Sequence, residues 1–277
     1  MISFGMWTTQ NLYAGKGPRG EVPMFSEPRF LRNSFSVVFS RQLTIRRLAN
    51  EFEDRLKGQY FQPQIVPVPD DIDPEVPRII FDSEHGYSQI VISQISCSLN
   101  VAYSPGWQTQ IENGRNYLLG RAFLLFDLLE IASVRNPYFC GLVTQAQMAT
   151  EQPDASIVAH LAHKLLKNEA VSDVHDLELK TTKIVSEQYF SNITVSNYRT
   201  WSIEGAAAGV QGLSRQSATE RGVRIVSDFN DRYSFNERPN YSTARTDVET
   251  IIHSGLMSTQ QAMSQIGGSH ESVKHHP

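Results

Sequence analysis

Apolar and small polar residues alternate along SQISCSLNVAY, the clearest strand pattern in the chain. The apolar positions are Ile95, Cys97, Leu99, Val101 and Tyr103, and a period of two is typical of a strand with one buried face. The preceding segment, RIIFDSEHGYSQIVIS, predicts a further short strand before this one, with residues 84–86 (EHG) as a hairpin turn. The two segments therefore predict antiparallel pairing.

Apolar residues that recur with the helical period of 3.6 positions predict three helices. Residues 41–57 carry Ile45, Leu48, Phe52 and Leu56 on one face, after the strand-like FSVVF and before Gly58. Residues 108–133 follow the turn SPGW, and their second half is apolar nearly all round, as in a helix buried on several sides. The last helix has Ser242 as its candidate cap and one apolar stripe: Val248, Ile251, Ile252, Leu256, Met263 and Ile266.

Between the first two helices, five prolines in PQIVPVPDDIDPEVP predict an extended acidic surface loop without regular structure. Its aspartates, Asp70, Asp71 and Asp73, lack the glycine and the later glutamate of a calcium loop. In the second half, FCGLVTQAQM predicts a strand and Asp154 a cap for a helix over 155–167. Three further strands are expected in LELKTTKIV, YFSNITVSNYRTW and GVRIVSDFNDRYSF.

Both halves can be written as strand, helix, antiparallel strands and long helix. This order predicts an α+β protein made of a duplicated module, with helices packed on one face of antiparallel sheet. The expected organisation is an N-terminal arm (1–34), a first module (35–150), a second module (151–266) and a flexible tail (267–277).

Three short motifs resemble a sporadically distributed family of uncharacterised bacterial proteins of about this length. They are AYSPGW, GVRIVSDFND and TIIHSGL, and the similarity covers most of residues 35–266. The resemblance implies the same fold and assigns no activity, so no catalytic residue is carried over. The segment GKGPRG lies outside it.

Composition indicates a soluble globular protein. Forty per cent of the residues are apolar and 19 per cent charged, and no apolar run approaches the ~20 residues that span a bilayer. The start, MISFGMWTTQ, lacks the basic and apolar regions of a signal peptide, so a cytoplasmic location is expected. The two cysteines, Cys97 and Cys140, are too few for a disulfide framework and are expected to be buried thiols.

The charge distribution is uneven. The net charge of −4 argues against a surface built throughout for nucleic acid. Residues 1–57, however, carry nine Lys/Arg and five Asp/Glu, whereas residues 58–150 carry four and nine. An anionic partner is therefore expected first at the N-terminal part, and the alternative is an ordinary solvated imbalance.

The segment IVAHLAHKLLK places two histidines beside two lysines on one helix face. His160, His163, Lys164 and Lys167 oppose the apolar stripe, and the ammonium groups disfavour a divalent cation. We expect no metal and no cofactor. The face is interpreted as solvated, with docking of an acidic partner or phosphate as the alternative.

No local catalytic motif is present. GKGPRG places a glycine and a proline after Lys16, where a phosphate-binding loop needs a hydroxyl, and GAAAGVQG (205–212) is followed by no Gly-Lys-Ser/Thr. There is no GxSxG, HExxH or CxxC. Asp228 and Asp231 suggest either a magnesium pair or a strand-end ion pair with Arg232, and the ion pair is favoured.

Aromatic residues alternate with cations near the N-terminus. The aromatic residues are Trp7, Tyr13, Phe25 and Phe30, and the cations are Lys16, Arg19, Arg29 and Arg32. Such residues can stack on single-stranded nucleic acid or a nucleotide, and they also anchor protein interfaces. The interface interpretation is favoured.

The sequence therefore predicts a non-catalytic binding or regulatory protein that acts through a protein partner in a bacterial or mobile-element setting, as a possible homodimer. One alternative is a nucleotide- or nucleic-acid-binding protein that uses the N-terminal cations and aromatics. Another is an enzyme acting on a phosphorylated substrate, with residues assembled from distant parts of the chain.

Overall fold

The computed structural model describes residues 24–167, 173–202 and 217–267. The first half contains β1 (Arg29–Val38), the 3-10 turn η1 (Ile45–Leu48), α1 (Ala49–Leu56), β2 (Gln64–Ile65), β3 (Ile79–Asp82), β4 (Ser88–Ile92), β5 (Ser96–Ala102) and α2 (Ile111–Ile131). The second half contains β6 (Phe139–Ala149), α3 (Asp154–Leu166), β7 (Glu178–Val185), β8 (Tyr189–Thr200), β9 (Glu220–Asn230), α5 (Arg232–Glu237) and α6 (Asp247–Gly267).

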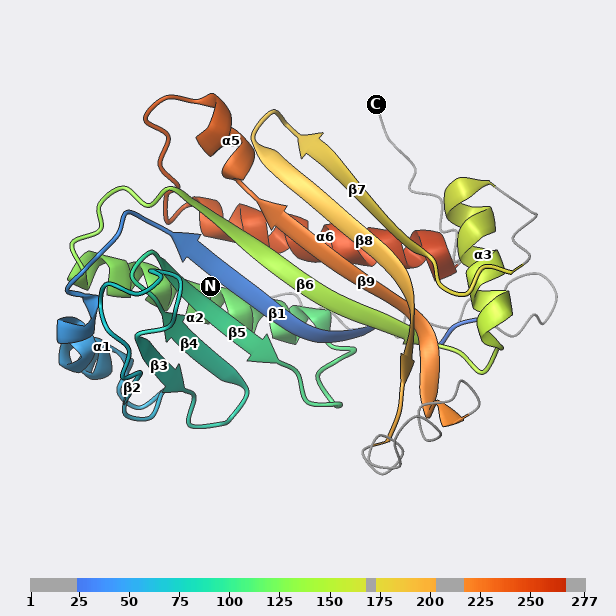
Figure 1. Ribbon diagram of the computed structural model, residues 1–277, viewed down its shortest axis with the longest axis horizontal. Coiled ribbons are helices and arrows are strands. Elements are labelled where there is room, and N and C mark those ends of the chain that lie inside the picture. Colours follow the sequence, from blue (N-terminus) through green and yellow to red (C-terminus); the bar gives the residue numbers. More distant parts are fainter. Residues whose placement is uncertain (1–23, 168–172, 203–216, 268–277) are drawn as a thin grey trace, which may run out of the picture.

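The strands form one nine-stranded antiparallel sheet in the order β2-β3-β4-β5-β1-β6-β9-β8-β7. Its centre is the pair β1 and β6 (Figure 1). Outward from that pair, β5, β4 and β3 take the same places on one side as β9, β8 and β7 on the other. The two halves thus share one order of elements, while their origin by duplication stays a prediction.

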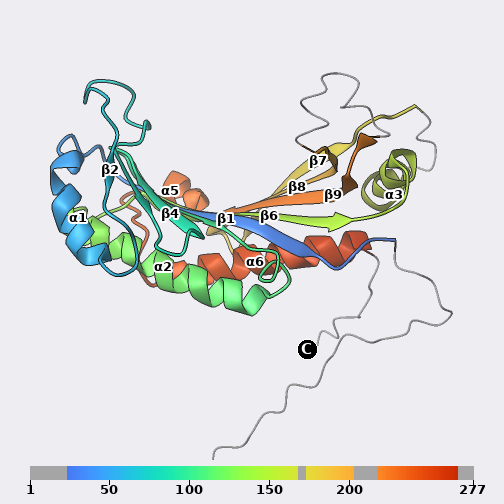
Figure 2. The same cartoon turned by 90° about the horizontal axis from the view of Figure 1, so that it is seen from below.

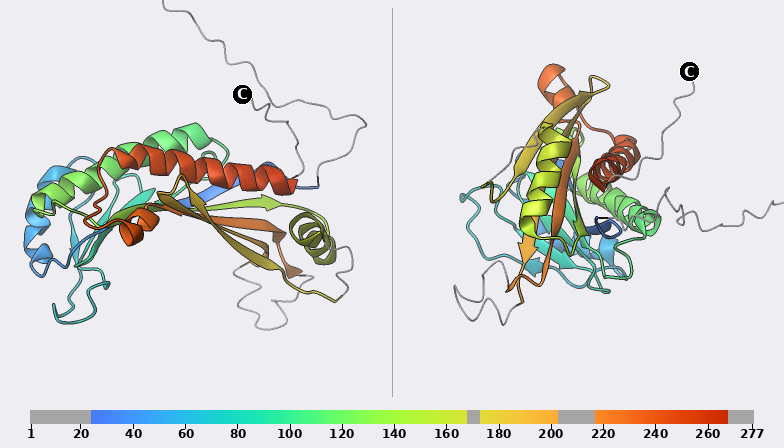
Figure 3. Two further views of the ribbon diagram at one scale, coloured as in Figure 1. Left: turned by 90° about the horizontal axis from the view of Figure 1, so that it is seen from above. Right: turned by 90° about the vertical axis from the view of Figure 1, so that its right-hand side faces the viewer.

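The two long helices cover the convex side of an arched sheet (Figure 3, left). The helix α2 packs on β5 and β1, and α6 packs on β9 and β6. Between the layers lie apolar side chains that the strand alternation points toward the helices, including Phe35, Leu99, Leu142, Ile225 and Phe229. The α+β class is thereby confirmed, and both long helices lie on one face of the sheet.

The shorter helices lie at the ends of the sheet. Figure 2 shows α1 beside the β2 end and α3 beside the opposite end of the sheet. An ion pair between Asp154 and Arg199, 3.0 Å apart and almost fully buried, fastens the start of α3 to β8. Asp154 was predicted to cap this helix, but the helix starts at Asp154 itself and its carboxylate makes no capping hydrogen bond.

Several predicted element limits are wrong. The helix expected over 41–57 begins only at Ile45, as a 3-10 turn. The segment GVRIVSDFNDRYSF changes from β9 to α5 after residue 230. The last helix starts at residue 247, beyond the predicted cap Ser242, whose hydroxyl donates to the Pro137 carbonyl. The segment before β5 holds two strands, β3 and β4, joined by the predicted turn.

The sheet crosses the predicted limits of the arm and the modules, which stay a prediction. β1 begins at Arg29, inside the predicted arm, and pairs with both β5 and β6. By its place in the sheet β6 is the counterpart of β1. The sheet runs through both halves without a break.

A buried arginine organises the proline-rich loop. The side chain of Arg78 is fully buried, and its guanidinium donates to the carbonyls of Val76, Pro69, Ile72 and Asp73. The Asp70 carboxylate lies 3.8 Å from Arg78 Nε. The loop is therefore acidic and mostly irregular, as predicted, although the two residues of β2 do pair with β3.

Candidate functional site

The side of the sheet opposite α2 and α6, here called the open face, is the main candidate surface. In the described chain only α5 packs on it, at one corner, through the ring contacts Phe139–Phe235 and Phe190–Tyr233. The strand registers place four basic and four acidic side chains on this face: Arg29, Arg32, Lys180 and Arg224, with Asp82, Glu178, Glu220 and Asp228. Most other positions carry hydroxyls, amides or small apolar groups.

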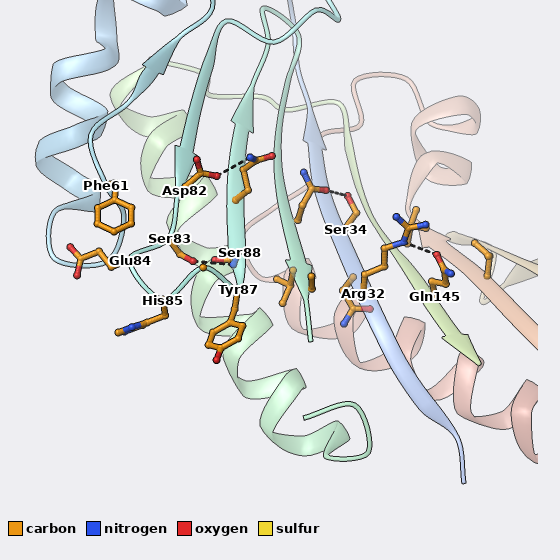
Figure 4. Close-up of a pocket in the computed structure, with 18 residues that line it drawn as sticks. Arg32, Ser34, Phe61, Asp82, Ser83, Glu84, His85, Tyr87, Ser88 and Gln145 are labelled. Atoms are coloured by element: carbon orange, nitrogen blue, oxygen red, sulfur yellow. Dashed lines mark hydrogen bonds between the residues drawn. The ribbon is translucent and has the colours of Figure 1, made fainter. Parts of the chain in front are cut away.

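A depression of about 1120 Å³ lies on the β3-β6 half of the open face (Figure 4). Its floor comes from β4, β5, β1 and β6, and the β3-β4 turn forms one wall. Phe61, which is 58% exposed, stands at its rim. The depression is wide and shallow, which suits an extended ligand better than a small enclosed one.

A row of polar side chains crosses the open face from β3 to β7, with one apolar position in its middle. The row consists of Asp82, Gln89, Asn100, Ser34, Val143, Asp228, Asn192 and Thr182. Neighbours hold one another: Gln89 donates to Asp82 at 2.9 Å, Ser34 to Asn100 at 2.7 Å and Thr182 to Asn192 at 2.8 Å. Val143 is 40% exposed. The row therefore offers fixed donors and acceptors on either side of an apolar contact.

Two arginines near the centre of the open face are bound by glutamines and not by carboxylates. Arg32 Nε donates to Gln145 Oε1 at 2.6 Å (Figure 4). With the Gln147 amide turned so that its oxygen faces Arg224, that oxygen accepts from Nε and Nη2 of Arg224, both at 3.1 Å. A neutral amide fixes a guanidinium without cancelling its charge, so both arginines can still bind a carboxylate or phosphate.

The charge of Arg29, which lies opposite Gln147 on β1 as Arg224 does on β9, is by contrast neutralised within the fold. Arg29 forms an ion pair with Glu220 at 2.6 Å, and the Tyr198 hydroxyl donates to the same carboxylate at 2.7 Å. Burial, followed by the hydrogen bond to Glu220, raises the pKa of Tyr198. Arg29 is therefore occupied within the fold, whereas Arg32 is the predicted cation that reaches the depression.

Of the N-terminal aromatic and cationic group, the structure describes only Phe25, Arg29, Phe30 and Arg32. Trp7, Tyr13, Lys16 and Arg19 lie outside the described residues, as does the glycine cluster 205–212. Phe25 and Phe30 are only 6% exposed and belong to the core, so they are not free stacking surfaces.

The predicted basic group on α3 is also divided. His160 Nε2 is 2.7 Å from the Ile266 carbonyl, and the Phe25 ring packs edge-on against it, so His160 joins α3 to α6. His163, Lys164 and Lys167 are exposed. Their exposure leaves both interpretations of this face open, and among the described residues His163 belongs to no group of three or more His, Cys, Asp or Glu that could hold a metal.

Asp228, near the end of β9, and Asp231, just after it, do not form a metal pair, nor the ion pair with Arg232 that was favoured. Asp231 is fully buried, where it accepts from the Cys140 backbone N–H and the Tyr241 hydroxyl, both at 2.7 Å. Asp228 faces the other side of the sheet and is held by Asn230. Arg232 stacks on the Phe139 ring. In the described parts of the chain no group of three or more His, Cys, Asp or Glu could hold a metal.

Both cysteines are buried free thiols, as predicted. Burial raises the pKa of each thiol, and at Cys140 the nearby Asp231 carboxylate adds to the effect. Neither thiol thus has the properties of a catalytic nucleophile.

The polar residues of the open face were not singled out in the sequence, because their signal is compositional. The polar positions that alternate with the core residues of β5 are Ser96, Ser98 and Asn100, all short and uncharged. Short uncharged side chains at these positions could have indicated a surface intended for contact.

Comparison of the sequence with models of known protein families and with curated proteins finds no match in either. None of the described helices is long and apolar enough to cross a membrane.

Proposed function

We propose that this chain is a non-catalytic binding protein that receives an extended segment of a partner protein on its open face. The observation that carries the proposal is the row of fixed hydroxyl and amide groups across a sheet face that helices leave uncovered. Such groups can donate to peptide carbonyls and accept from peptide N–H groups. Val143 in the middle of the row supplies an apolar contact for a side chain of the segment.

Charge supports a protein segment over nucleic acid. The open face carries four basic and four acidic side chains, and the four acidic ones would repel a phosphate backbone. A surface that binds nucleic acid draws most of its affinity from an excess of Lys and Arg. The two glutamine-bound arginines instead favour a segment with one or two carboxylates.

Site-specific photo-crosslinking tests the proposal. A benzoylphenylalanine at Val143 is expected to capture a protein in extracts of the native host, whereas the same group at Met257 is expected to capture none. Met257 is a matched control because it is similarly exposed, at 46% against 40%, and lies on a helix of the convex side.

A displayed library of random peptides gives the chemistry of the segment. Selected peptides should carry Asp or Glu and should bind Arg32→Gln several-fold more weakly, because the charged contact at an exposed site is worth about 1 kcal/mol. Crosslinks from Val143 to nucleic acid, or equal capture from both positions, would refute the proposal. Nucleic-acid crosslinks would favour the alternative predicted from the N-terminal residues.

A further inference from the structure

The two edges of the sheet are protected very differently. At one edge, β3 is covered by the two-residue β2, which is flanked by Pro63 and Pro67 and backed by the loop that Arg78 holds. At the other edge lies β7, a strand of eight residues. In the described chain no strand pairs with its outer side.

An unprotected strand of this length is a template for further pairing. On an antiparallel edge strand, every second residue directs its N–H and C=O away from the neighbouring strand. Six of the eight residues of β7 are exposed, and Ile184 is 55% exposed. Natural sheets usually shorten, bend or cover such an edge, as this chain does at β2.

The sequence of β7 suits pairing with itself in a register centred on Thr182. In an antiparallel pair centred on Thr182, that threonine faces its own copy, and Leu179 faces Val185 twice, on the side of the helices. Lys180 then faces Ile184, and no two like charges lie directly opposite. Moving the centre to Lys180 or Lys183 would place two lysines face to face, which is unfavourable.

We propose that the chain forms a two-fold symmetric dimer in which β7 pairs antiparallel with β7 of a second copy, centred on Thr182. The sheets of both copies then join into one continuous sheet, and the open faces lie on the same side of it when the pairing keeps the pleat. A closed two-fold contact also leaves no further β7 edge for growth, which limits the assembly to two copies. The dimer does not depend on the proposed function of the open face.

Sedimentation equilibrium tests the stoichiometry. The full chain is expected to shift from monomer to dimer as its concentration rises, with no larger species. Thr182→Lys should raise the dissociation constant roughly fivefold to tenfold, because it replaces a threonine pair by two opposed ammonium groups. A monomer at all concentrations, or an unchanged constant in Thr182→Lys, would overturn the proposal.

Cysteine crosslinking tests the register. Both native thiols are buried, so Thr182→Cys adds the reactive one and should form a disulfide-linked dimer under mild oxidation. Lys180→Cys, which faces Ile184 and not its own copy, should crosslink far more slowly, and Ala102→Cys on the exposed end of β5 reports random collision. Equal crosslinking of the three variants would refute the pairing even if a dimer exists.

Discussion

The substitution Arg78→Met removes the charge that holds the proline-rich loop against β3. The guanidinium is fully buried and donates through Nη1 to Val76 at 2.5 Å and through Nη2 to three further carbonyls at 3.2 to 3.4 Å. Methionine nearly matches the length of the aliphatic stem, so the packing loss is small and the lost hydrogen bonds dominate.

The expected loss of unfolding free energy follows from the number of guanidinium N–H groups that donate. Nη2 has two N–H groups for its three acceptors, so three N–H groups are in use. The carbonyls lie on a loop that can open to water, which favours about 1 kcal/mol for each bond and about 3 kcal/mol in total. Removing the buried charge together with its bonds keeps the cost below that of leaving an unpaired charge.

Urea unfolding measures the free energy, and limited proteolysis reports the loop. Arg78→Met should unfold with about 3 kcal/mol less stability and should be cut within residues 66–77 sooner than the unmodified chain. Arg47→Met is the matched control, because Arg47 is exposed on η1, and it should change neither result. A loss below about 1 kcal/mol with an unchanged cleavage rate would show that the carbonyl contacts do not hold the loop.

Three further outcomes are expected. Gly222→Ala places a Cβ 2.1 Å from a backbone oxygen of β6 and should destabilise the fold by about 2 kcal/mol or more in urea unfolding. Gly120→Ala is the control: open space surrounds Gly120 in α2, so this substitution should stabilise the fold by up to about 1 kcal/mol. Hydrogen bonds from the side chains of Asn197 and then Arg199 lower the pKa of Asp176 from 3.8 to about 2, although burial opposes them. The ionised Asp176 carboxylate should therefore stabilise the fold fully above about pH 4, and this stabilisation should be lost as the pH falls through 2. Asp176→Asn should remove this part of the acid unfolding curve. Both cysteines should resist a thiol reagent at pH 8 in the folded chain and react fully in urea, and rapid reaction without urea would contradict their burial.

Most of the secondary structure could be predicted from local periodicity. The buried set of β5 and the apolar stripe of α6 occupy the predicted positions, since a period of two or of 3.6 depends only on which face meets the core. The errors fall at element ends. Ser242 has the right chemistry for a cap, but it binds the Pro137 carbonyl, a partner 105 positions away.

The candidate site could be predicted only in part. Arg32 was identified as a cation that could meet a partner, and it lies in the depression. Its neighbours there, such as Asn100 and Gln145, come from strands β5 and β6 that are distant in sequence. Strand pairing and register decide which of these side chains lie next to one another, and the local sequence pattern contains neither.

The sequence by itself therefore determined the class of the fold, the helices and strands of both halves and the buried positions of the two thiols, because each depends on short-range patterning and on the cost of exposing apolar surface. Only the tertiary structure decided that the halves share one sheet, that His160 binds a carbonyl of α6 while Arg32 stays available, and that Asp231 is buried. It also decided that β2 covers one sheet edge, backed by the loop that Arg78 holds, and that no strand of the described residues pairs with the outer side of β7. The physical reason is that strand order and helix packing choose, among many polar side chains, which ones find a partner inside the fold and which remain free to bind another molecule.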